Sequence, residues 1–428
     1  MLTSSATSSG HAREVSASVP AIVLCQTVTG YATARALARN AIDVHAFLLD
    51  RHDPTRFSRL VRKVPCYGMD SNEAEQVAFL SDYAQRLGTR PVVFPCGDAQ
   101  ALLLARNAPR LSPYCRLWST SYEDLSRIIN KNELYEQVRS AGLPLVPGIS
   151  TPSFEQLKDW SAQNEAPYIL KPSYEGVGSC SLRAKNRIIA TRENLLQYAS
   201  VHGTQSLVIQ RVLRGGDGNI FDCYGLCDRD GRVVCLTSHH RLRQNPPDFG
   251  ATNFGEIPAP LPWAEEKALF DFTEAFFRSV HFHGIFGIEW LRDQQTGRFY
   301  LIDVNARPFL TIGHLDDCGV NLPLLAHREL SGECLLDADP RPTVTRKRWA
   351  YIMKDIETFR MIRPAGRIDT VAWLRSLAQC RSFAYCNWSD PLPGAYALMQ
   401  IAGRAARLVL RPSRPSPTQV PVDPAPGV

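Results

Sequence analysis

Apolar runs alternate with helical patterns over the first part of the chain. Residues 21–30 form an apolar, β-rich run that ends in glycine, and a helix-like stretch (31–40) and a second apolar strand (42–50) follow. The chain therefore opens with a βαβ unit. Residues 91–107 repeat the order of strand, turn and helix. This alternation predicts a parallel, doubly wound α/β sheet over residues 20–120.

Gly30 and Asp98 lie at the two strand-to-helix turns, where this architecture places ligands. No GxGxxG motif surrounds Gly30, so the sequence gives no reason to expect a dinucleotide site. Asp98 either caps the helix that follows it or contacts a substrate, and we favour the cap.

The pattern changes after residue 120. Two short helical segments occupy residues 121–150, and helices are expected near 153–163, 192–201 and 264–280. Short β-rich segments near 168, 182, 207, 220, 233, 285 and 300 predict antiparallel hairpins in an α+β region. The predicted organisation is a disordered tail (1–19), the N-terminal α/β domain (20–120), the α+β domain (121–335), a basic C-terminal extension (336–410) and a disordered Pro-rich tail (411–428).

Charge and composition narrow the functional classes. Residues from 341 onward carry 14 basic and 5 acidic side chains, whereas the first 340 carry 34 and 37. The basic extension could meet anionic lipid, an anionic polymer or nucleic acid, although a solvated surface is the commoner reason for clustered arginine. Neither a membrane-spanning apolar run nor a secretory signal is found in the sequence.

The 12 cysteines are scattered and include no CxxC pair, so we expect reduced thiols in a cytosolic protein. Cys223, Cys227 and Cys235 with His239 and His240 could be imagined as a zinc site. Their irregular spacing on a predicted hairpin favours small core residues and surface histidines instead.

The strongest chemical signal is a hairpin over residues 284–308. If its turn is centred near Thr296, Glu289 lies opposite Asp303, because paired residues in an antiparallel hairpin have a constant index sum. Two facing carboxylates repel unless a cation compensates them. Strand alternation places Asn305 and Arg307 on the same face as Asp303. Hard oxygen ligands suit Mg²⁺ that shares its shell with phosphate, and a guanidinium suits phosphate or carboxylate. A surface hairpin with a salt-bridged Arg307 is the plainer alternative.

Lys171 closes the apolar run 168–170 and opens onto a loop that contains Gly176 and Gly178. Glycines let backbone amides turn toward an anion, so the lysine and the loop are predicted to serve one phosphate ligand. An ordinary hairpin turn is an equally good explanation of the loop alone.

Five motifs occur in one order: "NKNELY", "YILKPSYEGVGS", "LVIQRVLRGGDG", "GIEWL" and "LIDVNARP". This order resembles the ATP-grasp superfamily, specifically its carboxylate-amine ligases such as the D-aspartate ligase group, over residues 20–330. The resemblance implies a pre-ATP-grasp α/β domain followed by a two-lobed ATP-grasp domain. The cofactors that it implies are ATP and Mg²⁺, bound as a pair of ions for which Mn²⁺ can substitute.

The resemblance also implies the nucleotide contacts. Lys131 and Lys171 match the lysines that hold phosphates, and Asp217 matches the acid that binds ribose. The hinge that meets adenine matches Gln210, Arg211, Val212 and Leu213. Many relatives carry Glu at the first hinge position, which leaves the contact of Gln210 with adenine open.

The remaining implied roles concern the metal and the reacting groups. Glu289, Asp303 and Asn305 match magnesium ligands, with Asp303 in place of the commoner Glu. Arg307 matches the arginine that grips the transferred phosphate. Arg241 and Arg243 match a stretch directed to the substrate cleft, with surface salt bridging as the rival explanation. Outside these motifs, His281 and His283 are expected to be helix-end and packing residues rather than bases.

The activity implied is ATP-driven activation of a carboxylate to an acyl phosphate, attack by an amine, and release of ADP and phosphate. Alternatives are carboxylase-like or carbamoyl-phosphate-synthase-like transfer, and a nucleotide-binding scaffold without turnover. The expected partners are a small carboxylate and an amine, with a cell-envelope or polysaccharide acceptor and a homodimer left open, and no nucleic acid. Residues 393–410 could form an amphipathic helix on a membrane surface or dock on the protein itself.

Overall fold

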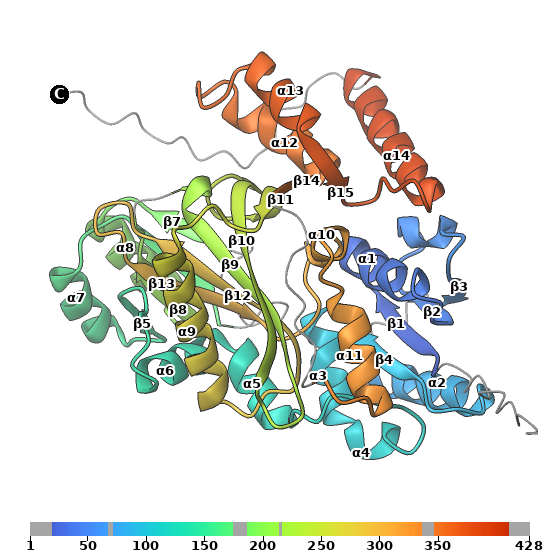
Figure 1. Ribbon diagram of the computed structural model, residues 1–428. Coiled ribbons are helices and arrows are strands. Elements are labelled where there is room, and N and C mark those ends of the chain that lie inside the picture. Colours follow the sequence, from blue (N-terminus) through green and yellow to red (C-terminus); the bar gives the residue numbers. More distant parts are fainter. Residues whose placement is uncertain (1–18, 67–71, 174–185, 214–215, 336–345, 411–428) are drawn as a thin grey trace, which may run out of the picture.

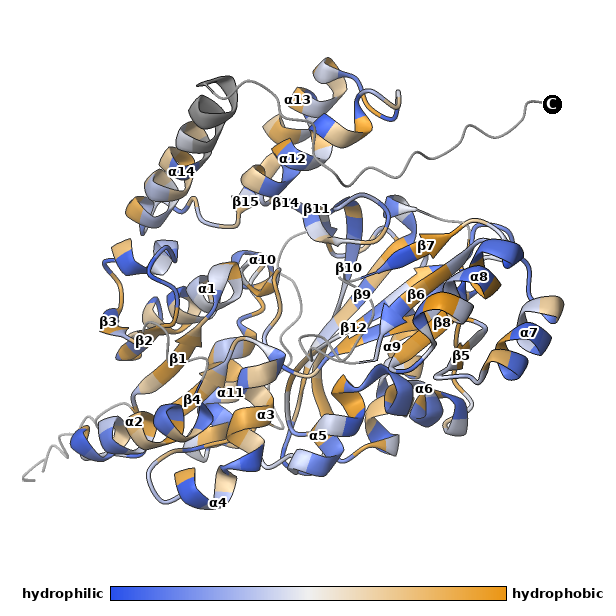
Figure 2. Cartoon of the chain, turned by 180° about the vertical axis from the view of Figure 1, so that it is seen from behind, coloured by the Kyte–Doolittle hydropathy of each residue, from blue (hydrophilic) through white to orange (hydrophobic). Residues whose placement is uncertain are grey.

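The computed structural model describes residues 19–66, 72–173, 186–213, 216–335 and 346–410. These residues form three sheets with helices packed around them (Figure 1). Hydrophobic residues concentrate in the strands and on the inner sides of the helices, as the hydropathy colouring shows (Figure 2). The predicted tails and the loop that carries Gly176 and Gly178 lie outside the described residues.

The N-terminal sheet has four strands in the order β3-β2-β1-β4, and all of its pairs are parallel, as the sequence predicted. Its strands are β1 (Ala21–Cys25), β2 (Val44–Leu48), β3 (Arg62–Pro65) and β4 (Val92–Pro95). Its helices are α1 (Thr27–Ala38), η1 (Pro54–Phe57), α2 (Glu73–Arg86), α3 (Asp98–Arg106) and α4 (Ala108–Leu111). Gly30 lies inside α1, where a Cβ would come 2.6 Å from the Cα of Cys25. Its role is close packing of helix on strand.

A small antiparallel sheet follows, with the order β5-β8-β6-β7. Its strands are β5 (Gly148–Ser150), β6 (Tyr168–Pro172), β7 (Arg187–Ile189) and β8 (Leu207–Arg211). The helices of this region are α5 (Tyr122–Ile129), α6 (Lys131–Ser140), α7 (Phe154–Gln163) and α8 (Arg192–His202). The helices expected at 153–163 and 192–201 are confirmed, whereas the strand expected near 182 falls outside the described residues.

The third sheet has seven strands in the order β13-β12-β9-β10-β11-β14-β15. Its strands are β9 (Ile220–Cys227), β10 (Val233–Asn245), β11 (Ala251–Ile257), β12 (Gly284–Arg292), β13 (Phe299–Asn305), β14 (Lys347–Ala350) and β15 (Cys380–Phe383). The accompanying helices are η3 (Asp217–Asn219), α9 (Trp263–Ser279), α10 (Ile312–Asp317) and α11 (Leu322–Ser331). Every pair is antiparallel except β14 with β15. The predicted hairpins are therefore confirmed.

The C-terminal region is more ordered than its loose pattern indicated. It adds β14 and β15 to the edge of the seven-stranded sheet and contains α12 (Ile352–Ile362), α13 (Thr370–Ala378) and α14 (Pro391–Leu410). Near its start, α14 packs on η1, where the rings of Tyr396 and Phe57 lie 4.3 Å apart. Part of this helix thus docks on the protein itself. No helix among the described residues is long and apolar enough to cross a bilayer.

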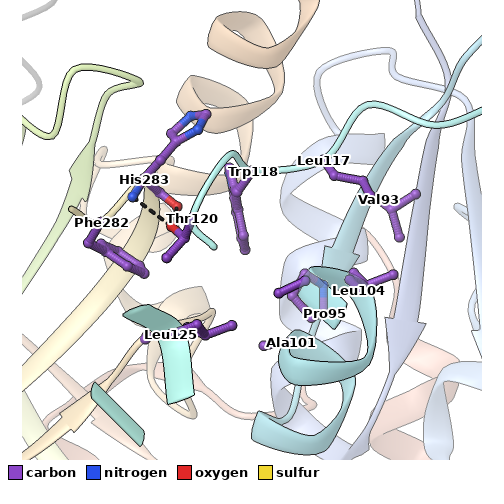
Figure 3. A pocket seen from close by; sticks show the side chains of 12 residues that line it. Val93, Pro95, Ala101, Leu104, Leu117, Trp118, Thr120, Leu125, Phe282 and His283 are labelled. Carbon is purple, nitrogen blue, oxygen red and sulfur yellow. Dashed lines mark hydrogen bonds between the residues drawn. The ribbon is translucent and has the colours of Figure 1, made fainter. Parts of the chain in front are cut away.

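A junction of buried side chains joins the first and third sheets (Figure 3). Thr120 exchanges hydrogen bonds with the backbone of His283, whose Nε2 lies 2.8 Å from Glu329 Oε2. Beside them is a largely apolar cavity of about 30 Å³ that Trp118 and Phe282 help to line. His283 is therefore a packing residue, as expected.

The three cysteines considered for a zinc site lie in the core, as the sequence favoured, but His239 does not lie on the surface. Cys223, Cys227 and Cys235 are buried core residues, and the described cysteines are all free thiols. His239 is fully buried rather than on the surface, because its ring packs in the third sheet beside Asp222. Among the described residues, no cluster of three or more His, Cys, Asp or Glu side chains is suited to a metal ion.

Candidate functional site

A cavity of about 1000 Å³ lies where the three sheets meet. One wall comes from the carboxyl ends of β1 and β4, where Gln26 and Gly97 begin the following turns. The opposite walls come from β6 and β8 of the small sheet and from β9, β10, β12 and β13 of the large sheet. This volume suits a ligand larger than an amino acid.

Three carboxylates stand in one row across the large sheet. The register pairs Glu289 on β12 with Asp303 on β13, which confirms the predicted hairpin, and pairs Glu289 on its other side with Asp222 on β9. Glu289 and Asp303 line the cavity, with exposed side-chain fractions of 17% and 28%, whereas Asp222 is fully buried. Such a row is stable only if its charges are offset.

Two basic side chains offset the row. Lys131 Nζ lies 3.0 Å from both oxygens of Asp303. Arg241 Nη2 lies 2.6 Å from Glu289 Oε1 and 2.6 Å from Asp222 Oδ1. A divalent cation is thus not the sole means of holding these carboxylates together, contrary to the argument from sequence.

Asp222 is the member of the row that the sequence analysis missed. Burial alone would raise the pKa of its carboxyl, but the guanidinium of Arg241 and the bond to His239 hold that pKa well below its usual range. His239 Nδ1 and the Tyr224 hydroxyl lie 2.7 and 3.0 Å from its Oδ2. The available signal was a lone acidic residue within an otherwise apolar strand, 220–227.

Two carboxylates of the row, Glu289 and Asp303, fit a magnesium ion together with the amide oxygen of Asn305. Glu289, Asp303 and Asn305 all line the cavity, and Asn305 Nδ2 donates to Glu289 Oε1 over 3.2 Å, which leaves the amide oxygen of Asn305 available. Two carboxylates and an amide oxygen are an incomplete shell for Mg²⁺, which normally completes its shell with phosphate oxygens and water.

Most of the residues that are expected to contact the nucleotide line the cavity. Lys131, Lys171 and the hinge residues Gln210, Arg211, Val212 and Leu213 all do so. Lys131 is brought there by the start of α6, where Asn130 caps the helix by accepting from the Asn132 amide. Lys171 Nζ lies 3.4 Å from the Tyr135 hydroxyl.

Asp217 does not line the described cavity. Its Oδ1 accepts from Gln244 Nε2 at 2.9 Å and from the Asp248 amide at 2.6 Å, and burial raises the pKa of its carboxyl. Gln244 and Asp248 themselves face the cavity, and no motif identified them. The contact of Asp217 with ribose stays a prediction.

Arg307 lies at the domain junction in contact with Asp98. Its Nε is 2.7 Å and its Nη2 3.3 Å from the two oxygens of Asp98, and both residues line the cavity. Asp98 is the first residue of α3 rather than its cap, a position that Gly97 takes. The preference for a capping role is thus wrong, because the carboxylate turns to a guanidinium 209 residues away.

Arg243 does not face the described cavity, contrary to its expected place beside Arg241. Its guanidinium pairs with Asp355 of α12 at 2.7 and 2.9 Å and lies 3.8 Å from the ring centroid of Phe254. The physical reason is a break in register on β10 between Arg241 and Arg243, which interrupts strand alternation.

A cavity between a parallel α/β sheet and two antiparallel sheets, with carboxylates and lysines on its wall, is the arrangement expected of an ATP-grasp fold. Residues 130–311 match the family described as carbamoyl-phosphate synthase L chain, ATP binding domain. The chain therefore has the N-terminal α/β domain and two-lobed ATP-grasp fold of that superfamily and resembles its carboxylate-amine ligases.

Individual relatives agree with this assignment. The chain is 25% identical to a D-aspartate ligase of Enterococcus faecium over 61% of its own length and 64% of that protein. It resembles the L-amino acid ligase of Bacillus licheniformis with a TM-score of 0.57 and 18% identity, over 77% of this chain and 79% of that one. The biotin carboxylase domain dimer of Hydrogenobacter thermophilus 2-oxoglutarate carboxylase, in complex with MgADP, gives a TM-score of 0.61 at 16% identity, covering 77% and 73%.

Proposed function

We propose that this protein is an ATP-dependent carboxylate-amine ligase that forms an amide bond through an acyl phosphate and releases ADP and phosphate. The observation that carries the proposal is the carboxylate row of Asp222, Glu289 and Asp303, which is held by Lys131 and Arg241 at the wall of a 1000 Å³ cavity. The likeness to a D-aspartate ligase and an L-amino acid ligase supports amide formation.

In this proposal, Glu289, Asp303 and Asn305 hold a pair of Mg²⁺ ions, which Mn²⁺ can replace. Bound there, the metal would neutralise phosphate oxygens in the transferred group. Lys131 and Lys171 contact phosphates, and the hinge formed by residues 210–213 contacts adenine. The oxygens that now bind Lys131 and Arg241 would be shared with the metal.

Arg307 and Arg241 act on the reacting groups. A carboxylate and a triphosphate repel each other, so cations fixed on both sides of the junction must hold them in line. Arg307 enters from the domain junction, and Arg241 enters from β10 behind Glu289. These arginines supply charge at fixed positions, without a covalent intermediate on the protein.

The same proposal extends to the substrates, the location and the assembly of the protein. The substrates are a small carboxylate and an amine, with a cell-envelope or polysaccharide carboxylate as one acceptor class. The protein acts in the cytoplasm as a homodimer, and α14 beyond its contact with η1 supplies a peripheral membrane contact. A carboxylase-type reaction is the second candidate, favoured by the fold shared with a domain crystallised with bicarbonate and MgADP.

Calorimetric titration with MgADP tests the nucleotide site. Wild-type protein should bind in a magnesium-dependent manner, and the Glu289→Gln/Asp303→Asn variant should lose that dependence. Glu265→Gln is a matched control, because Glu265 of α9 pairs at 3.0 Å with Arg292, which lies on β12 like Glu289, and neither residue lines the cavity. Absent magnesium-dependent binding, or binding unchanged in the double variant, would overturn the proposal.

ADP release across a panel of acids and amines then tests the chemistry. Amide products identified by mass spectrometry support the ligase, whereas ADP release that requires bicarbonate alone supports the second candidate. Nucleotide binding without turnover on a broad panel would favour a scaffold.

A further inference from the structure

The turn between β10 and β11, residues 245–251, forms part of the cavity wall. Asp248, Phe249, Gly250 and Ala251 line the cavity. The turn is compact, because a Cβ on Gly250 would lie 2.1 Å from the carbonyl carbon of Asn245. The Asp248 amide donates to Asp217 at 2.6 Å. The conformation of this β10–β11 turn therefore shapes one side of the cavity.

Helix α12 of the C-terminal region holds both ends of this turn. Thr358 Oγ1 donates to the carbonyl of Gln244 at 2.8 Å, just before the turn. Asn245 Nδ2 and Asn253 Nδ2, one at each end, donate to the carbonyl of Lys354 at 3.2 and 3.3 Å. Figure 1 shows α12 beside β10 and β11. The two ends are thus fixed to a single helix.

The tip of the turn has its own contact. Arg367, which follows α12, places Nη1 and Nη2 at 2.7 and 2.8 Å from the two oxygens of Asp248. Gly366, with φ of +69°, allows the chain to reverse so that Arg367 points back toward the sheet. The buried pair of Arg243 with Asp355 anchors α12 to β10. In the part of the chain that the structure describes, the cavity wall itself ends at Thr311, so residues 346–367 act from outside it.

We propose that Arg367 is a positioning residue for the ligand cavity and that residues 346–367 are a support that fixes the β10–β11 turn. A carboxylate held by both oxygens in an arginine fork has one orientation, which fixes the backbone of Asp248. The Asp248 amide donates to Asp217, which also accepts from the cavity residue Gln244. The predicted effect on nucleotide affinity rests on the proposed function, whereas the predicted rigidity of the turn does not.

The test compares Arg367→Ala with two reference variants. Lys354→Ala is the matched control, because Lys354 pairs with Glu357 inside α12 and is 42% exposed, against 40% for Arg367. Arg367→Lys keeps the charge but loses the fork. Arg367→Ala should weaken MgADP binding about fivefold, as expected for losing a part-exposed ion pair. Arg367→Lys should lie between wild type and Arg367→Ala, and Lys354→Ala should match wild type.

A double variant separates positioning from general destabilisation. Asp248→Asn keeps a side chain that tolerates the backbone φ of +70°. In that background, the loss of affinity caused by Arg367→Ala should be smaller but not zero, because Arg367 Nη2 also lies 3.8 Å from Asp217 Oδ2. Equal affinity of Arg367→Ala and wild type, an equal loss in Lys354→Ala, or an undiminished loss in the Asp248→Asn background would each overturn the proposal.

Hydrogen exchange gives a readout that needs no nucleotide. Amides of residues 248–252 should exchange faster in Arg367→Ala than in wild type or Lys354→Ala, because the tip of the turn is released. If wild-type protein binds no MgADP, the proposed function fails while this measurement still decides on the support. Unchanged hydrogen exchange in Arg367→Ala would reject the proposed support of the β10–β11 turn.

Discussion

Arg241 and Arg243 lie two positions apart on β10, and their surroundings differ in a way that separates site from scaffold. Both guanidiniums contact a fully buried aspartate, Asp222 for the first and Asp355 for the second. Only Arg241 makes a further contact with a cavity carboxylate, Glu289. The same chemical pair thus serves the ligand cavity in one case and the attachment of α12 in the other.

The difference teaches that an arginine–carboxylate pair does not identify a functional site by itself. Burial of an ion pair is costly to create and costly to break on one side, so both pairs are constrained by the fold. What distinguishes Arg241 is that its second partner, Glu289, faces a cavity that can accept a ligand. Activity measurements should therefore distinguish substitutions of Arg241 from those of Arg243, whereas stability measurements should show a loss for both.

The largest expected effect is on catalysis. Arg241→Lys should lower kcat for ADP release about 100-fold, the range found when a fixed electrostatic donor is lost. Arg243→Lys should leave kcat within about twofold. Both should lower the unfolding free energy by about 1–3 kcal/mol, because a lysine cannot replace a buried bidentate fork. Steady-state kinetics with the best acid and amine measure kcat, and urea unfolding measures the unfolding free energy. Equal losses of kcat in Arg241→Lys and Arg243→Lys would contradict the different roles of the two arginines.

The next effect is a dependence of unfolding free energy on pH. It comes from His239, which binds Asp222, the buried partner of Arg241. Burial lowers the pKa of His239 in the folded protein, although its bond to Asp222 acts the other way. The unfolded chain therefore takes up a proton below pH of about 6.5 that the folded chain resists. Unfolding free energy should fall from pH 7 toward pH 5, by at most about 1.4 kcal/mol per pH unit for this histidine.

Asp222 does not contribute in that window. Its pKa is held below the usual range, so the stability that it provides is present above pH of about 4 and is lost as the pH falls further. His239→Gln should reduce the slope of unfolding free energy between pH 7 and 5, measured by urea titration, without abolishing it, because burial also lowers the pKa of His45, His314 and His327. His281→Gln, at an exposed position, is the control and should leave the slope unchanged. An unchanged slope in His239→Gln would assign the whole pH dependence to the other buried histidines.

The sequence predicted those features that depend on local periodicity. The parallel strands and the facing of Glu289 and Asp303 follow from alternation and from a hairpin centre, and both are present. The position of Arg243 could not be predicted the same way, because a break in register leaves no mark in the hydrophobic pattern. The contact of Asp98 with Arg307 joins residues from two domains, which only the packed structure brings together.

The C-terminal region shows a second limit of the pattern. Strands β14 and β15 have four residues each, too short for alternation to be distinguished from a loop. Helix α13 has no fully buried residue, and its inward face, which includes Leu377, is only partly buried, so its pattern is weak. Their order comes from pairing with β11 and from contacts such as Arg243 with Asp355, which are long-range and invisible to a local reading.

The smallest effect extends the comparison to Arg307, whose partner Asp98 is only part buried. Removing this carboxylate by Asp98→Asn takes a negative charge from a cavity expected to hold phosphates, so MgADP should bind more tightly, by less than about fivefold. Asp43→Asn is the control, because Asp43 pairs with Arg62 at 2.8 Å on the surface of the same domain. Calorimetry at low and high salt checks the result, since the gain should shrink as salt screens the charge. Weaker binding in Asp98→Asn would instead mean that Asp98 holds Arg307 in its working position, as Asp222 holds Arg241.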